Sequence, residues 1–140
     1  MFNSQIKAKS ILCITIATCL SAIAFQPDVK AQSLSKKLSV LSEIENQDYP
    51  RMVGREIRVD SAFAGPGKRF GYNLTLVNYS ANQIDGAKFA RKLQPMAVKK
   101  LCNSSYTGFF REQKVTMEIR IYDKGRSLVG RSKVSPSQCK

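Results

Sequence analysis

Few residues of this chain could do chemistry, because the sequence contains no histidine. Catalysis by Ser-His-Asp or Cys-His groups is therefore excluded, as are the usual zinc sites. Three carboxylates remain as candidates, Glu56, Asp60 and Glu118, and each has an arginine one or two positions away. That spacing favours cross-strand ion pairs over the paired acids of a glycosidase. We predict a protein that is not an enzyme and that has no metal site and no cofactor.

Residues 1–31 have the composition of a signal peptide. Lys7 and Lys9 precede the uncharged run ILCITIATCLSAIAF, which is shorter than the roughly 20 apolar residues of a membrane span. Small residues mark two cleavage sites, after Ala24 or after Ala31, and we favour the second. The alternative is an uncleaved membrane anchor. We expect cleavage to leave a periplasmic or secreted protein with no membrane-spanning segment.

The cysteines that could form a disulfide are Cys102 and Cys139, because Cys13 and Cys19 lie in the segment that is removed. A pair of cysteines in an oxidising compartment is normally bonded. Closing a loop of this length stabilises by roughly 4 kcal/mol through the entropy of the unfolded chain. The alternative, a redox-active pair, is disfavoured because the spacing is not Cys-x-x-Cys. We predict a single domain over residues 32–140 that is held by one disulfide.

Hydrophobic periodicity predicts the order helix, two strands, helix, two strands. The stretch SLSKKLSVLSEIENQ has the spacing of a helix, and REIRVDSAF and FGYNLTLVNY alternate as a hairpin around AGPGKR, with Ile57, Val59 and Phe63 on the apolar face of the first strand. A second helix follows in IDGAKFARKLQPMAVKKLC, which Pro95 should kink or end. KVTMEIRIYD and SLVGRSKV predict a second hairpin. We expect an α+β domain, a four-stranded antiparallel sheet with both helices on its apolar face.

Two surfaces are candidates for binding. The first is the polar face of the predicted sheet, where strand pairing would align Arg58, Asn73, Thr75, Arg120, Arg131 and Lys133. The second is the loop NSSYTGFFRE, which contains Tyr106, Phe109 and Phe110. If these rings are exposed they would anchor a partner, whereas rings beside a disulfide more often pack over it as core. For the sheet, the alternative is a solvated face without a ligand.

The chain is strongly basic, with 23 Lys and Arg against 10 Asp and Glu and a net charge of +13. In an exported protein this excess suggests contact with an anionic surface, although it also serves solubility alone. No recognised motif accompanies the charge, so nucleic acid is not the expected partner. We predict a monomeric binding protein for an unidentified protein or anionic envelope component. The alternative is a basic module held by charge to anionic glycan, lipid or extracellular DNA.

Several motifs between Tyr49 and Cys139 resemble a known family. They are YP before the first strand, AGPGKRFGYNLTL at the first hairpin, KKLC at the end of the second helix, VTMEIRIYDKGR, and SPSQC at the carboxyl end. With these motifs the chain resembles the small exported bacterial proteins grouped as quorum-sensing-regulated virulence factors, which have a cystatin-like α+β fold. The resemblance implies a bacterial source and a periplasmic or secreted, non-enzymatic role. It supplies no active residues.

Overall fold

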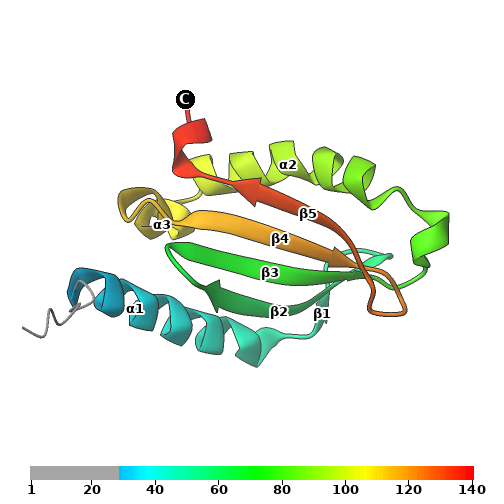
Figure 1. Ribbon diagram of the computed structural model, residues 1–140, viewed down its shortest axis with the longest axis horizontal. Helices are drawn as coiled ribbons and strands as arrows, with labels where there is room; N and C mark the ends of the chain where they lie inside the picture. Colours follow the sequence, from blue (N-terminus) through cyan, green and yellow to red (C-terminus); the bar gives the residue numbers. More distant parts are fainter. Residues whose placement is uncertain (1–28) are drawn as a thin grey trace, which may run out of the picture.

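The computed structural model of the protein describes residues 29–140 (Figure 1). Its helices and strands are α1 (Val29–Glu45), β1 (Arg51–Met52), β2 (Ile57–Gly65), β3 (Arg69–Leu76), α2 (Gly86–Asn103), α3 (Gly108–Glu112), β4 (Thr116–Tyr122) and β5 (Leu128–Val134). In this part of the chain no helix combines the length and the hydropathy needed to cross a bilayer. Most of the predicted signal peptide lies outside the described residues.

The strands form one sheet in the order β1-β2-β3-β4-β5. All neighbouring pairs are antiparallel except β3 and β4, which are parallel. The predicted four-stranded antiparallel sheet is therefore wrong in both number and direction, because the α+β domain has a mixed sheet of five strands. The physical reason is α2, which connects β3 to β4. This helix returns the chain to the end of the sheet where β3 begins, so β4 runs in the same direction as β3.

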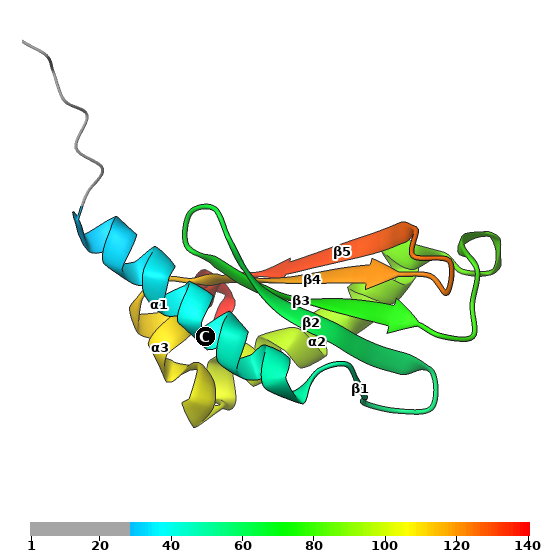
Figure 2. The same ribbon diagram turned by 90° about the horizontal axis from the view of Figure 1, so that it is seen from below.

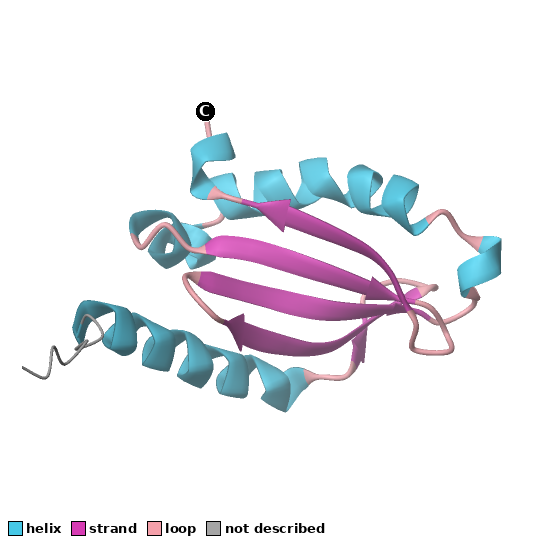
Figure 3. Cartoon of the chain, in the orientation of Figure 1, coloured by secondary structure: helices cyan, strands magenta, loops and turns pink. Residues whose placement is uncertain are grey.

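Both long helices cover the same face of the sheet, as the sequence predicts (Figure 2). Helix α1 packs on β2, whereas α2 packs on β5 at the other side of the sheet (Figure 3). The main core lies between these layers and consists of Leu34, Leu38, Ala62, Phe70, Ala97, Leu101, Phe110, Val115, Met117 and Val134. Ile44, an apolar residue near the end of α1, remains 56% exposed.

Strand β2 contains an irregularity that changes the face of Phe63. The register shifts between Val59 and Ser61, so the alternation of side chains moves by one residue. Phe63 therefore lies on the polar face opposite Gly71, where the guanidinium of Arg120 stands 4.0 Å from its ring centroid. The prediction that Phe63 shares the apolar face with Val59 is wrong for this reason.

Helix α2 continues through Pro95, so of the two effects expected of this proline, a kink or an end of the helix, the second is wrong. The side chain of Asp85 starts the helix by accepting a hydrogen bond from the backbone N–H of Lys88, at 2.9 Å. Pro95 is exposed, and the carbonyl of Arg91 that loses its partner belongs to an exposed residue as well. Water can therefore replace the missing helical hydrogen bond.

Two further ties complete the fold. The side-chain amide of Asn46 donates to the carbonyl of Ala62 at 3.0 Å and accepts from its N–H at 2.7 Å. Like the short strand β1, the side chain of Asn46 therefore satisfies backbone groups at the outer edge of β2. At the other end, Cys102 and Cys139 form the predicted disulfide, with their Cα atoms 5.3 Å apart. The carboxyl end is thereby joined to the last turn of α2.

Candidate binding groove

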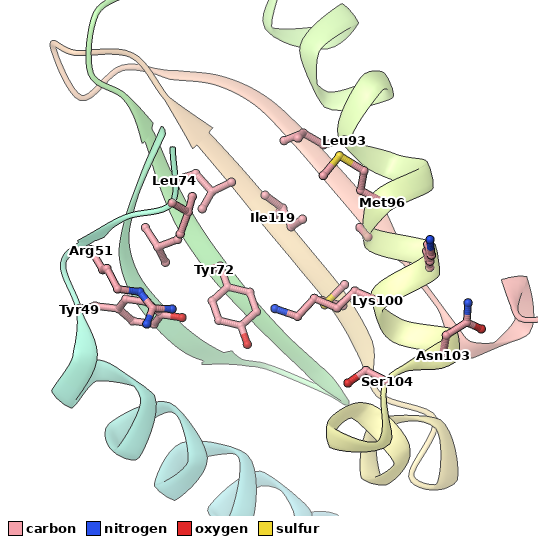
Figure 4. A pocket seen from close by; sticks show the side chains of 15 residues that line it. Tyr49, Arg51, Tyr72, Leu74, Leu93, Met96, Lys100, Asn103, Ser104 and Ile119 are labelled. Atoms are coloured by element: carbon pink, nitrogen blue, oxygen red, sulfur yellow. The ribbon is translucent and has the colours of Figure 1, made fainter. Parts of the chain in front are cut away.

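An apolar groove of about 770 Å³ lies between α2 and the sheet, on the face that carries the helices (Figure 4). Its floor is formed by sheet side chains, namely Val59, Tyr72, Leu74, Met117 and Ile119. One wall is α2, with Leu93, Met96, Ala97 and Lys100, and the other is the chain after α1, with Tyr49, Arg51 and Val53. Apart from the cations at its rim, the groove presents mostly apolar and aromatic side chains.

The groove exists because the two long helices lie toward opposite sides of the sheet. Helix α1 packs on β2 and α2 on β5, which leaves the middle of the apolar face without a helix over it. Large hydrophobic side chains therefore stay open to solvent at its walls, with Met96 69% and Val53 53% exposed. Exposed apolar side chains gathered in a concave site are typical of a surface that binds a partner.

A second depression of about 470 Å³ follows the groove along the same face of α2 and β3. It is lined by Gly54, Arg55, Glu56, Ile57, Leu76, Tyr79, Ile84 and Phe89. The lining runs from Phe89 of α2 at this end to Ser104, the residue that follows the helix, at the other. At 1.5 Å per residue this stretch of helix is about 22 Å long. The two depressions together therefore offer an elongated apolar site.

Three tyrosines surround Glu45 at the Ser104 end of the groove. The hydroxyl of Tyr72 donates to the carboxylate of Glu45 at 3.2 Å, that of Tyr49 at 3.4 Å, and that of Tyr106 also donates to it. Burial, together with the neighbouring carboxylate of Glu45, raises the pKa of Tyr72 and of Tyr106 well above the usual phenol value. These hydroxyls therefore stay protonated and act as donors.

The polar residues predicted to align on the sheet do share one face, opposite the groove. The register pairs Arg58 with Thr75, Asn73 with Arg120, Arg120 with Arg131, and Lys133 with Glu118. Arg131 and Lys133 are exposed on β5, and no ion pair involves either of them among the described residues.

Several cations of this face are paired with carboxylates. The guanidinium of Arg58 lies 2.5 Å from Asp60, and Glu118 contacts Arg120 at 2.9 Å and Arg69 at 3.6 Å. These partners differ from those of Glu56, which accepts a hydrogen bond from Tyr79. The three carboxylates considered for catalysis thus have separate partners.

The aromatic loop is divided between core and surface. Phe110 is buried and packs against Phe70 with ring centroids 5.1 Å apart, and Phe109 is half-buried beside it. Tyr106 is 54% exposed and lies at the Glu45 end of the groove. Arg111 donates to the carbonyls of Leu101 and Ser104, so it caps α2. Of the three predicted aromatic contacts, only Tyr106 lies near the groove, in a smaller depression that shares Tyr72 and Lys100 with it.

Sequence analysis did not identify the groove. The apolar residues of α2 differ in burial in a way that the helix pattern does not predict, since Ala97 is buried whereas its neighbour Met96 is exposed. One feature of the sequence could have indicated the groove. The predicted strands and helices together supply more apolar residues than two helices can cover on one face of a sheet. Among residues 29–140, no group of three His, Cys, Asp or Glu side chains is placed to hold a metal ion.

No family model matches the chain, and no curated protein matches it by sequence. Solved structures with a similar fold include PA3611, a protein of Pseudomonas aeruginosa described as secreted, with 13% identity and a TM-score of 0.70 over 82% of this chain and 100% of that one. EpsS, the pilotin of the Vibrio vulnificus type 2 secretion system, has 16% identity and a TM-score of 0.62 over 79% and 96% of the two chains. AspS, the type II secretion system pilotin of Vibrio cholerae, has 14% identity and a TM-score of 0.59 over 79% and 95%. At these identities the similarity establishes a shared α+β fold.

Proposed function

We propose that this protein is a non-enzymatic, exported binding protein that holds an amphipathic helix of an envelope protein in the groove between α2 and the sheet. The observation that carries the proposal is the open apolar groove itself, with Met96 and Val53 more than half exposed at its walls. Covering such side chains with apolar residues of a partner stabilises a complex by roughly 25 cal/mol per Å² of area buried.

The backbone of the sheet favours a helix as the occupant. Strands β2, β3 and β4 form the floor, and each has a hydrogen-bonded neighbour on both sides. An extended peptide lying over this floor would find no free strand edge beneath it, and the edge strand at the groove wall, β1, has only two residues. Most of the peptide's N–H and C=O groups would therefore be buried without partners. A helix satisfies these groups internally, and a site about 22 Å long accommodates about four turns.

The disulfide and the similar structures support a location outside the cytoplasm. A bond between Cys102 and Cys139 is stable in an oxidising compartment, which supports a periplasmic or secreted location. We propose that removal of residues 1–31 leaves a single domain of residues 32–140. The fold shared with a secreted protein and with two type 2 secretion pilotins supports an envelope role. The motif resemblance to exported, cystatin-like virulence factors supports the same role.

The experiment is a binding assay with a labelled synthetic amphipathic helix of about 15 residues that carries a leucine stripe. The exported protein should bind this probe, and Met96→Glu should weaken binding by about tenfold or more, because a charge would then face the apolar stripe. Leu128→Glu is the matched control, since Leu128 is 42% exposed on β5 outside both depressions. Absence of binding at about 100 µM, or equal effects of the two substitutions, would contradict the proposal.

A second candidate function is supported by the outer face of α2. Lys88, Arg91 and Lys92 of this helix lie outside both depressions, and the helix contains no acidic residue. Such a face complements anionic glycan, lipid or DNA. Binding by charge should fall steeply between roughly 50 and 200 mM salt and should weaken in Lys92→Glu, whereas the helix bound in the groove should lose little in either case.

A further inference from the structure

We propose that Arg51 and Lys100 select an acidic residue near the amino end of the bound helix and thereby fix its direction in the groove. This inference rests on the proposed function, and it specifies which segments the groove accepts. Both residues line the groove at its Ser104 end, Arg51 from the chain after α1 and Lys100 from α2 (Figure 4).

The two cations stand over aromatic rings without a carboxylate partner. The guanidinium of Arg51 lies 5.9 Å from the ring centroid of Tyr49, and the ammonium of Lys100 lies 5.8 Å from that of Tyr72. Neither forms an ion pair within residues 29–140. Stacking on a ring holds a cation at the edge of the apolar site while leaving its donors free for a further partner.

Glu45 lies at the same end of the groove, but its carboxylate oxygens already accept hydrogen bonds from other side chains. They accept hydrogen bonds from the hydroxyls of Tyr49, Tyr72 and Tyr106. Asp48 also lines this end and makes no ion pair in the described chain. A carboxylate on a bound helix would therefore meet two cations whose charge the protein has not neutralised through direct contact.

The charge of the site differs between its two ends. At the Ser104 end three cations, Arg51, Lys99 and Lys100, outnumber the two carboxylates Glu45 and Asp48, whereas the Phe89 end contains one acid and one base, Glu56 and Arg55. Acidic residues in the first turn of a helix are favoured by the dipole of that helix. The bound helix therefore has its amino end near Ser104 and runs antiparallel to α2.

The protein's own apolar run does not match this requirement. The run ILCITIATCLSAIAF is preceded by Lys7 and Lys9 rather than by acids. Two lysines beside Arg51 and Lys100 would repel them, so charge complementarity favours a separate protein as the occupant.

The test uses three versions of the synthetic helix that differ only in a Glu, Gln or Lys pair in the first turn. The exported protein should prefer the Glu probe over the Gln probe by about fivefold at physiological salt. Lys100→Glu and Arg51→Glu should each remove this preference, and Lys100→Glu should bind the Lys probe better than the unchanged protein does. Lys92→Glu is the control, because it makes the same charge change on α2 outside the groove. If Lys100→Glu fails to fold, Lys100→Gln should show the same loss of preference.

Direction is measured with a paramagnetic label on the first residue of the Glu probe. The label should broaden the NMR signals of Ser104 and leave those of Ile84, at the opposite end, unaffected. Equal binding of the three probes, or broadening at Ile84, would overturn the inference while leaving the groove as a helix-binding site. Failure of all three probes to bind would instead contradict the proposed function.

Discussion

Glu118 shows how single residues shape the polar face of the sheet. Its side chain is only 1% exposed and contacts Arg120 at 2.9 Å and Arg69 at 3.6 Å. Burial pushes the pKa of Glu118 upward, but the hydrogen bond and charge of Arg120, with the charges of Lys133 and Arg69, lower it below the usual carboxyl value. The carboxylate therefore neutralises cations that would otherwise repel one another on this face.

The lowered pKa of Glu118 predicts a pH-dependent stability. Because this pKa is lower in the folded chain than in the unfolded one, the charged carboxylate stabilises the fold above the unfolded pKa and stops doing so as the pH falls through the folded one. Glu118→Gln should therefore be less stable than the unchanged protein above about pH 5, and the gap should shrink below about pH 4. Urea midpoints across this range measure the gap. Glu112→Gln, at an exposed position of α3, is the control, and a gap that stays constant with pH would contradict the prediction.

Residue types were more predictable than residue partners. The sequence predicted cross-strand ion pairs, and only the pair of Glu118 with Arg69 joins two strands. Asp60 and Glu118 also pair with an arginine of their own strand, and Glu56 has no ion pair among the described residues. It placed Phe63 on the wrong face because a shift in register between two strands depends on both of them, and a single strand pattern does not contain it. The exposure of Tyr106 was left open, since it depends on where α1 places Glu45.

At the scale of elements, α2 and β5 are held at a very short distance by glycine. A Cβ atom built on Gly86 would lie 1.9 Å from the carbonyl oxygen of Val129, and one on Gly130 would lie 2.5 Å from the carbonyl oxygen of Gly86. Backbone atoms cannot move away as a flexible side chain can. The first turn of α2 therefore touches β5 directly, which sets the position of the groove wall above the sheet.

Gly86→Ala should therefore destabilise the protein by about 3 kcal/mol, because the added methyl group forces the helix and the strand apart. Denaturant unfolding followed by circular dichroism measures the loss. Gly54→Ala is the matched control, since no atom lies within 4 Å of a Cβ built at that position, and it should change stability by less than about 1 kcal/mol. Equal stabilities of the two variants would refute the close contact.

Periodicity was sufficient for the long elements and insufficient for their pairing. The two helices and four long strands follow from apolar spacing in the sequence. The parallel contact between β3 and β4 does not, because spacing within a strand says nothing about its neighbours. Strand β1 has two residues and α3 has five, too few for a period to be recognised.

At the scale of the whole molecule, the disulfide fixes the carboxyl end against α2. It joins residues separated by 37 positions, and the tail between β5 and Cys139 contains a short turn at Pro136–Gln138. Because the same end of α2 carries Lys100, the bond also anchors the cationic end of the groove.

Replacing both Cys102 and Cys139 with serine should lower the free energy of unfolding by about 4 kcal/mol, since the unfolded chain regains the entropy of an open loop. Thermal unfolding of the double variant and of the reduced protein measures this loss, and the two should agree. Unchanged unfolding in both samples would show that the bond does not constrain the unfolded chain.

The groove is a property of the whole molecule, and this explains why sequence analysis missed it. Leu74 and Met96 belong to different elements, and each has the pattern of a core residue in its own element. Only the separation of α1 from α2 across the sheet decides which apolar residues are covered. That separation is set by contacts such as Gly86 with Val129, which are distant in the chain.

The parallel alignment of β3 with β4 has a consequence for the order of assembly. The central pair of strands, β3 and β4, joins residues that are far apart in the chain, such as Arg69 and Thr116. The pairs β2–β3 and β4–β5, in contrast, are local hairpins. Distant contacts carry a larger loop-closure cost and form late. A chain that emerges amino end first would therefore hold this edge of β3 unpaired until β4, near the carboxyl end, has formed. During that interval the unpaired edge is open to misassembly with other chains.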